Sequence, residues 1–291
     1  MRAARLHELG GTPRVDDVPA PAEANLEVTT SALNPVDISI GSGRFYGGVP
    51  DTPYVIGSEA VGRTPDGRRV WCYDRGVMAE RATVDAELLV DVPDGVDDAT
   101  AIACGIAGLT GWLAVTWRAA ATAEDTVLVL GASGSVGAAA VQAAKVLGAR
   151  AVGAARNVDA IPRAADEALS LDDDLPAATV VIDALWGEPA ERALAAAARG
   201  VRFVQLGQSA GANATVQSAW LRGKFAHLLG YSLGASPPDV RARGYRELCE
   251  HARDGRVHFD VESYPLERID EAWTRQASGS PRAKLVITVA G

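Results

Sequence analysis

Three glycines, spaced three residues apart, follow a run of aliphatic residues. TVLVL at 126–130 leads directly into GASGSVG at 131–137, and an apolar helical pattern follows. A glycine-rich string alone usually marks a loop, but between a buried strand and a helix it favours dinucleotide binding. The glycines permit a tight turn, close approach of a pyrophosphate and close helix packing, and the helix N-terminus holds the phosphates. We therefore expect a cofactor site at Gly131, Ala132, Ser133, Gly134, Ser135, Val136 and Gly137.

The end of the next predicted strand indicates which dinucleotide binds. An NAD enzyme needs a carboxylate there, whereas an NADP enzyme needs a cation for the 2′-phosphate. The strand ends in Ala154, Ala155, Arg156 and Asn157, with no acid. Arg156 can make a charge-assisted contact to phosphate, with Asn157 beside it, so the sequence favours NADPH. Two alternatives stay open: Arg156 is a solvated surface charge, and Arg163 adds a second cation.

Two further strand ends are candidates for the nicotinamide side of the site. Residues 183–186 and 206–208 each follow an apolar run. Ligands of open α/β sheets lie outside the carboxyl ends of the strands. Leu185, Gly207 and Gln208 are therefore predicted to line the cofactor, although a strand end can also have no ligand.

The elements around these residues indicate two kinds of domain. Strands at 126–130, 151–155, 179–184 and 202–206 alternate with helices at 136–147 and 189–198, which predicts an α/β fold with a doubly wound parallel sheet. Before residue 107, short β-branched runs at 26–30, 69–73, 80–84 and 88–92 predict a β-rich domain. Beyond residue 230 we expect helices at 240–254 and 267–278, with strands at 257–264 and 283–289.

Composition excludes several classes of partner. The 291 residues are 48% apolar and 22% charged, with a formal net charge of −9. This charge disfavours nucleic acid and anionic lipid. Cys72, Cys104 and Cys249 lie too far apart for a disulfide framework or a metal-ligand spacing. With no signal peptide and no apolar stretch of about 18 residues, we expect a soluble cytoplasmic protein without a membrane partner.

Several spaced motifs together resemble the medium-chain dehydrogenase/reductase superfamily, in its zinc-independent quinone oxidoreductase and enone reductase branch. They are ALNPVD at 32–37, PYVIGSEAVG at 53–62, AGLTGW at 107–112, GASGSVG, GKFAHLLGYSL from 223 and YPLERIDEAW at 264–273. The resemblance implies a Rossmann domain at 113–236 inserted in a chaperonin-like β-barrel catalytic domain at 1–112 and 237–291. It also implies a homodimer that pairs the edge strand at 228–233.

The resemblance also implies that no metal is bound. Zinc-containing members carry Cys and His at the positions of Asn34 and Ser58, and Cys104 lies only near the third ligand position. Glu59 is then expected to be structural. Without a Lewis acid nothing stabilises an alkoxide, whereas a quinone or an α,β-unsaturated carbonyl accepts hydride from NADPH with hydrogen-bond donors alone.

Catalytic candidates follow from the same resemblance: Asn34 and Asp37 in the active site, and Thr110 near the nicotinamide. Each also has a structural interpretation: Asn34 as a turn residue, Asp37 as an internal cap and Thr110 as an ordinary helix position. Quinone reductase relatives carry a tyrosine and an arginine where this chain has Ser39 and Gly41.

Tyr46, in the loop SGRFYGG, is the candidate replacement donor, although it can equally be a packing residue. The loss of the family's tyrosine and arginine keeps a second hypothesis open. In that hypothesis the chain is an NADPH-binding scaffold or sensor without redox turnover.

Overall fold

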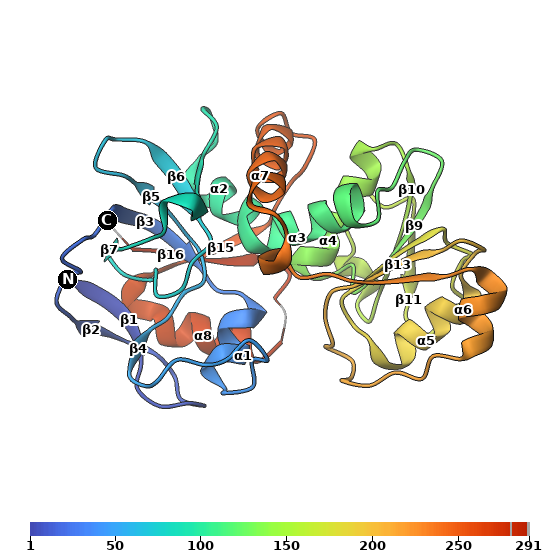
Figure 1. Ribbon diagram of the computed structural model, residues 1–291, viewed down its shortest axis with the longest axis horizontal. Coiled ribbons are helices and arrows are strands. Elements are labelled where there is room, and N and C mark those ends of the chain that lie inside the picture. Colours follow the sequence, from blue (N-terminus) through green and yellow to red (C-terminus); the bar gives the residue numbers. More distant parts are fainter. Residues whose placement is uncertain (280, 290–291) are drawn as a thin grey trace. The chain divides into compact units, whose positions relative to one another are not determined.

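The computed structural model describes residues 1–279 and 281–289, which divide into two compact units (Figure 1). Unit 1 comprises Met1–Ile106 with Tyr245–Gly291, and unit 2 comprises Ala107–Gly244. The sequence expectation placed the boundaries at 112/113 and 236/237. In the expected and the observed division alike, one contiguous segment is inserted between the two parts of the other unit.

Unit 2 contains a six-stranded parallel sheet in the order β11-β10-β9-β12-β13-β14. Numbered from β9, this is the order 3-2-1-4-5-6 of a doubly wound dinucleotide-binding fold, so the predicted α/β class is confirmed. Leu128, Val181 and Phe203 lie in its core. The strands are β9 (Thr126–Leu130), β10 (Arg150–Ala155), β11 (Glu167–Ser170), β12 (Val180–Asp183), β13 (Arg202–Gln205) and β14 (His227–Gly230).

Three helices of unit 2 connect its parallel strands, which need crossover connections: α4 (Ser135–Val146) joins β9 to β10, α5 (Gly187–Ala196) joins β12 to β13, and α6 (Ser218–Lys224) joins β13 to β14. The 3₁₀ turn η4 (Val158–Ala160) lies between β10 and β11. Helix α3 (Leu109–Leu113) and the π-helical turn η3 (Ala114–Arg118) precede β9, and the 3₁₀ turn η5 (Leu233–Ala235) follows β14.

Unit 1 joins strands from both ends of the chain. Strand β16 lies between β15 and β3 in the sheet β15-β16-β3-β5-β6-β8, with β7 beside β3, and a second sheet has the order β2-β1-β4. The expected closed chaperonin-like barrel stays a prediction. The strands are β1 (Arg2–Leu6), β2 (Arg14–Asp17), β3 (Leu26–Ala32), β4 (Tyr54–Val55), β5 (Ala60–Arg63), β6 (Arg69–Cys72), β7 (Arg81–Ala82), β8 (Leu89–Asp91), β15 (Val261–Pro265) and β16 (Lys284–Thr288).

One register in this sheet matters for the site. Strands β3 and β16 are antiparallel, with Ala32 opposite Val286. Continuing that register by two residues brings Asn34 level with Lys284.

Helices complete unit 1. They are α1 (Pro35–Gly41), α2 (Asp98–Ala103), the π-helical turn η2 (Cys104–Gly108), α7 (Pro238–Arg253) and α8 (Ile269–Ala277), with 3₁₀ turns η1 (Ala86–Leu88) and η6 (Leu266–Arg268). Turn η2 and helix α7 each extend across a boundary between the units.

By length and apolar composition alone, the helical segment Asp98–Arg118 could cross a membrane. It therefore corrects the expectation that no apolar stretch of this length occurs. Most of the segment is buried inside the protein, which is typical of a core helix.

Candidate functional site

A buried carboxylate organises the polar side chains of unit 1. Glu59 precedes β5 and is fully buried, and both of its carboxylate oxygens are hydrogen-bonded. Oε1 accepts from Asn34 Nδ2 and from Lys284 Nζ, each at 2.9 Å. Oε2 accepts from Trp71 Nε1 at 3.0 Å and from the Ile106 backbone at 2.7 Å. Four donors thus satisfy this charge, as burial requires.

A glycine makes the fourth contact possible. Gly105 breaks the helical path inside the turn η2, with φ −63° and ψ −134°. A Cβ at this position would lie 2.0 Å from Glu59 Oε2 and 2.5 Å from Trp71 Nε1. Only glycine therefore allows the backbone to approach the carboxylate closely enough for Ile106 to donate.

The partners of Asn34 fix the orientation of its side-chain amide. Lys284 Nζ donates to Asn34 Oδ1, to the Leu33 carbonyl at 3.2 Å and to Glu59. Because ammonium only donates and carboxylate only accepts, the oxygen of Asn34 faces Lys284 and its nitrogen faces Glu59. Among the described residues the second Nδ2 proton has no acceptor. The amide therefore offers one oriented donor.

This donor set does not fit zinc. Catalytic zinc takes three nitrogen, sulfur or carboxylate ligands, whereas the positions expected to match its ligands hold Asn34 and Ser58, next to a lysine ammonium. Cys104 is buried, and burial together with a hydrogen bond to Cys249 raises the pKa of its thiol well above the ordinary value. Within residues 1–279 and 281–289, no group of three His, Cys, Asp or Glu side chains could hold a metal ion.

Asp37 lies beside this cluster and is 3% exposed. Its Oδ2 accepts from the Asn34 backbone at 2.8 Å, so Asp37 caps α1 internally, and Oδ1 accepts from Ser58 Oγ at 2.6 Å. Burial raises the pKa of Asp37 to about 6, although these two hydrogen bonds and Lys284 oppose the shift. Asp37 therefore has two roles: it caps helix α1 and it contributes a carboxylate to the polar cluster.

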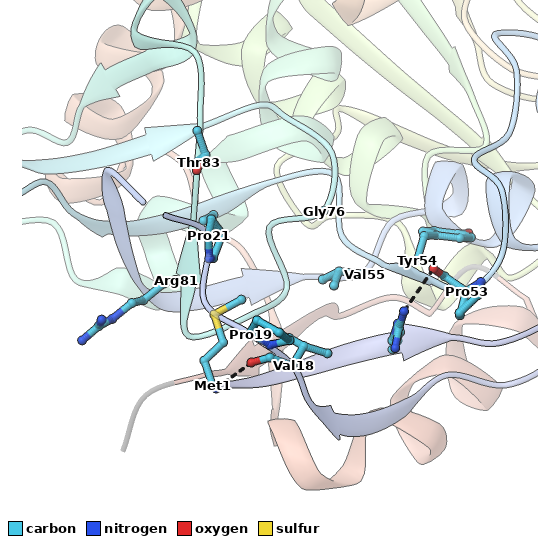
Figure 2. A pocket seen from close by; sticks show the side chains of 12 residues that line it. Met1, Val18, Pro19, Pro21, Pro53, Tyr54, Val55, Gly76, Arg81 and Thr83 are labelled. Carbon is cyan, nitrogen blue, oxygen red and sulfur yellow. Dashed lines mark hydrogen bonds between the residues drawn. The ribbon is translucent and has the colours of Figure 1, made fainter. Parts of the chain in front are cut away.

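Two cavities in unit 1 share Tyr54, Val55 and Gly76 in their linings. The larger one, of about 360 Å³, is lined by Met1, Arg5, Arg81 and several prolines (Figure 2). The smaller, of about 210 Å³, is lined by Asp37, Ser58, Tyr54, Arg75 and aliphatic side chains. In Figure 2 the phenol of Tyr54 points away from Met1 and Val18 of the larger cavity.

The other catalytic candidates lie elsewhere. Tyr46 is 86% exposed and packs its ring against Phe45, with a centroid separation of 4.8 Å, so it does not join the Glu59 cluster. Thr110 lies in α3 of unit 2, one residue before Gly111. A Cβ on Gly111 would lie 2.3 Å from the Val136 carbonyl, so α3 packs tightly on the first turn of α4. Thr110 thus belongs with the glycine motif.

That motif has the geometry that its spacing predicts. Gly131 has φ +82° at the turn after β9, and Gly134 directly precedes α4. A Cβ on Gly137 would lie 2.3 Å from the Gly131 carbonyl oxygen, so close packing of helix and turn requires glycine there. On Gly134 the nearest atom would be 3.6 Å away, which leaves this position open. The loop lies where the strand order reverses, between β9 and β12.

The remaining cofactor candidates lie at the carboxyl ends of the same sheet. Arg156 and Asn157 are exposed directly after β10, and Arg156 has no side-chain hydrogen bond or ion pair among the described residues. Leu185 contacts the position of Gly131, at 3.1 Å from a Cβ placed there. Gly207 lies close to the Ala184 carbonyl, and Gln208 is exposed after β13.

Asp183 is a further group at this sheet end that the sequence did not single out. It is fully buried at the end of β12, and its Oδ1 accepts from the Leu185 and Trp186 backbones at 2.8 and 3.0 Å. Burial raises the pKa of Asp183 to about 6, against those hydrogen bonds. It holds the turn that carries Leu185.

Lys284, Trp71 and Tyr54 are site residues that sequence reasoning missed. The one local signal was a lysine that opens the aliphatic strand KLVIT, since lysine is rarely buried without a partner. No comparable signal marks Trp71 or Tyr54.

Comparison with known proteins identifies related sequences. A family model described as zinc-binding dehydrogenase matches residues 129–287. A phenolphthiocerol/phthiocerol polyketide synthase of Mycobacterium tuberculosis is 29% identical over 99% of this chain, which spans 14% of that protein. Quinone oxidoreductase of Mus musculus is 33% identical over 53% of this chain and 52% of its own length.

Solved structures include close matches to the whole fold. Quinone oxidoreductase from Thermus thermophilus, solved alone and with NADPH, has a TM-score of 0.83 at 26% identity and covers 99% of this chain and 100% of its own. A mycobacterial quinone oxidoreductase has a TM-score of 0.89 at 23% identity, with 99% of both chains covered. At 23% identity, the similarity to the mycobacterial protein shows a shared fold.

Proposed function

The chain belongs to the zinc-binding dehydrogenase family of the medium-chain dehydrogenase/reductase superfamily, and we propose that it is an NADPH-dependent reductase of quinones or α,β-unsaturated carbonyls that works without zinc. One observation carries this proposal. The amide of Asn34 is locked by Lys284 and Glu59 so that it presents a hydrogen-bond donor where zinc-containing relatives are expected to hold a ligand.

An oriented donor suits reduction of an activated acceptor. Bound NADPH supplies the hydride. As hydride reaches carbon, negative charge moves onto the carbonyl oxygen of the acceptor, and we propose that the second N–H of the Asn34 amide donates to that oxygen. The neighbouring contacts hold this N–H in place before reaction, so little reorganisation is needed.

Unit 2 has the residues to hold NADPH. The N-terminus of α4 offers backbone N–H groups to the pyrophosphate, and the open position at Gly134 allows a close approach. Arg156, exposed and without a partner in the part of the chain that the structure describes, and the neighbouring Asn157 suit the 2′-phosphate. Leu185, Gly207 and Gln208 suit the nicotinamide side. The Thermus thermophilus relative was solved with NADPH, which supports this choice of cofactor.

The similarity to a polyketide synthase over nearly the whole chain supports a biosynthetic role. We infer that the acceptor is an activated double bond in a pathway intermediate, reduced as a tailoring step. The expected cytoplasmic location and the homodimer also belong to this proposal. The dimer is supported by β14, an edge strand on which Leu228 is 43% exposed.

The test is NADPH oxidation by purified protein with a panel of enones and quinones, with and without chelator, together with metal analysis. We expect turnover with at least one enone, unchanged by chelator, and no stoichiometric zinc. Zinc near one equivalent that is lost together with activity would overturn zinc independence. NADPH binding without any turnover would favour the scaffold or sensor hypothesis. Sedimentation of a monomer at micromolar concentration would contradict the dimer.

A further inference from the structure

The smaller cavity of unit 1 has a lining suited to an organic group. Its apolar lining residues include Ile40, Pro50, Val55 and Ile56, and its polar ones are Asp37, Ser58, Tyr54 and Arg75. Its volume of about 210 Å³ far exceeds the ~10–15 Å³ that one water requires. Apolar walls with a few convergent polar groups are typical of small-molecule sites.

Tyr54 has the one phenol in this lining, and its oxygen is buried without a hydrogen-bond partner among the described residues. Asp37 and Ser58 are already paired with each other, so neither satisfies it. Burial, and then the charge of Asp37, raises the pKa of Tyr54 to about 12, which keeps the phenol protonated. A buried donor without an acceptor is costly to a fold, so each such group needs an explanation.

We propose that this cavity is a specificity pocket for a compact apolar group that carries an oxygen acceptor, and that Tyr54 Oη donates to that oxygen. Asp37 joins the pocket to the site, because the carboxyl group that lines the cavity also holds the Asn34 backbone at 2.8 Å. Arg75 also lines the pocket, and its exposed guanidinium lies 5.6 Å from the Phe45 ring centroid.

The inference rests on the proposed function in that the oxygenated group belongs to the reducible acceptor. It adds to that function the prediction that the protein discriminates between acceptors with and without this oxygen. A buried donor penalises a ligand that lacks the acceptor, so the pocket selects oxygenated groups over hydrocarbons of equal shape.

The test uses cyclopentanone and methylenecyclopentane, which differ mainly in the exchange of an oxygen for a CH₂ group, and neither is an enone. Their binding to the whole protein is measured by ligand-observed NMR, without turnover. Wild type is expected to bind the ketone about threefold to tenfold more tightly, as one neutral hydrogen bond allows. Tyr54→Phe should bring this ratio to about one and leave the alkene affinity unchanged.

Tyr264→Phe is the matched control, because Tyr264 Oη donates to Glu262, which does not line the cavity. It should keep the wild-type ratio. Tyr54→Phe removes a hydroxyl without a partner, so its melting temperature should not fall. An unchanged ratio in a folded Tyr54→Phe variant would overturn the pocket, as would equal affinity of wild type for both probes. Because the assay needs no hydride transfer, failure of the proposed reductase activity would be seen separately.

Discussion

The candidate site in unit 2 is formed mainly by backbone, whereas the candidate site in unit 1 is formed mainly by side chains. In unit 2 the loop proposed to bind the cofactor is seven consecutive residues whose role depends on backbone shape, with Gly131 at φ +82° and Gly137 without room for a Cβ. In unit 1 the cluster around Glu59 takes side chains from three other segments and a backbone N–H from a fourth, with Asn34 and Lys284 separated by 250 residues. A backbone site is encoded by local spacing, whereas a side-chain site depends on strand register.

The units also treat charge differently. Unit 1 buries an ion pair, since the side chains of Lys284 and Glu59 are 3% and 0% exposed. Unit 2 keeps Arg156 exposed and without a protein partner among the described residues. The Lys284–Glu59 charges therefore have a structural role, whereas the guanidinium of Arg156 is available to a ligand.

The largest expected effect tests the buried pair. Lys284→Met leaves Glu59 without its counter-ion and should lower the free energy of unfolding by about 3–5 kcal/mol in urea titrations. The double variant Glu59→Gln/Lys284→Met, which removes both charges, should regain much of that loss. Arg268→Met, at an ion pair whose side chains are both more than half exposed, is the surface control and should change stability little. If Lys284→Met and Arg268→Met lowered the free energy of unfolding equally, the buried pair would be no more important than a surface pair.

The next prediction concerns Asp37 and Asp183, since each unit buries one carboxyl group whose pKa is raised from 3.8 to about 6. Between these values the folded chain keeps a proton that the unfolded chain releases, so this contribution to stability falls as pH rises from about 4 to about 6. Each carboxyl contributes at most about 3 kcal/mol to this fall.

Asp183→Asn keeps an oxygen for the Leu185 and Trp186 backbones, since both donate to Oδ1, and removes only its own share of the pH dependence. Unfolding of wild type and variant across this pH range measures the difference. Parallel stability curves would show that Asp183 titrates normally.

Arg156 tests whether exposed charge serves the cofactor. A charge-assisted hydrogen bond contributes about 1.5–3 kcal/mol, so Arg156→Ala should weaken NADPH about 10-fold to 150-fold. NADH, without the phosphate, should bind nearly as before. Fluorescence titration with both cofactors measures this, and Arg163→Ala tests in the same way whether a second cation contributes. Unchanged NADPH affinity in Arg156→Ala would remove Arg156 from the site.

The smallest effect separates two glycines of one motif. A methyl at position 137 meets backbone atoms at 2.3 and 2.8 Å, so Gly137→Ala should cost about 1–3 kcal/mol of stability. Gly134→Ala meets nothing closer than 3.6 Å and should fold normally but bind NADPH more weakly. Melting temperature and NADPH titration, measured on both variants, separate the two. A destabilised Gly134→Ala would show that its role is packing.

Much of unit 2 could be predicted because its strands are continuous apolar runs. The strand predicted at 126–130 is β9 with the same bounds. Strand β11 was missed because EALS alternates polar residues at a sheet edge, and α6 because Gln217 gives it no side-chain cap. A local sequence pattern does not predict a strand or helix that is stabilised mainly by contacts with neighbouring elements.

The site in unit 1 was predictable only in part, for the same reason. Asn34 and Asp37 were found from their local motif, but the pairing of β16 with β3 brings Lys284 to them. Of two tyrosines eight residues apart, sequence favoured Tyr46, which the structure places 86% exposed, whereas Tyr54 is drawn inward by pairing with Leu6 on β1. No local feature distinguishes the two, and a catalytic role for Tyr46 stays a prediction.

The position of β16 between β3 and β15 also sets an order of events during synthesis. Unit 2 is one contiguous stretch, so it can fold as soon as it leaves the ribosome. Unit 1 must wait, because until β16 emerges the end of β3 at Thr30–Ala32 lacks its partner strand and the Glu59 carboxylate lacks its ammonium. For the time needed to translate residues 107–283, the N-terminal strands form an incomplete sheet with an open edge. This nascent half-sheet is where a chaperone would be most needed.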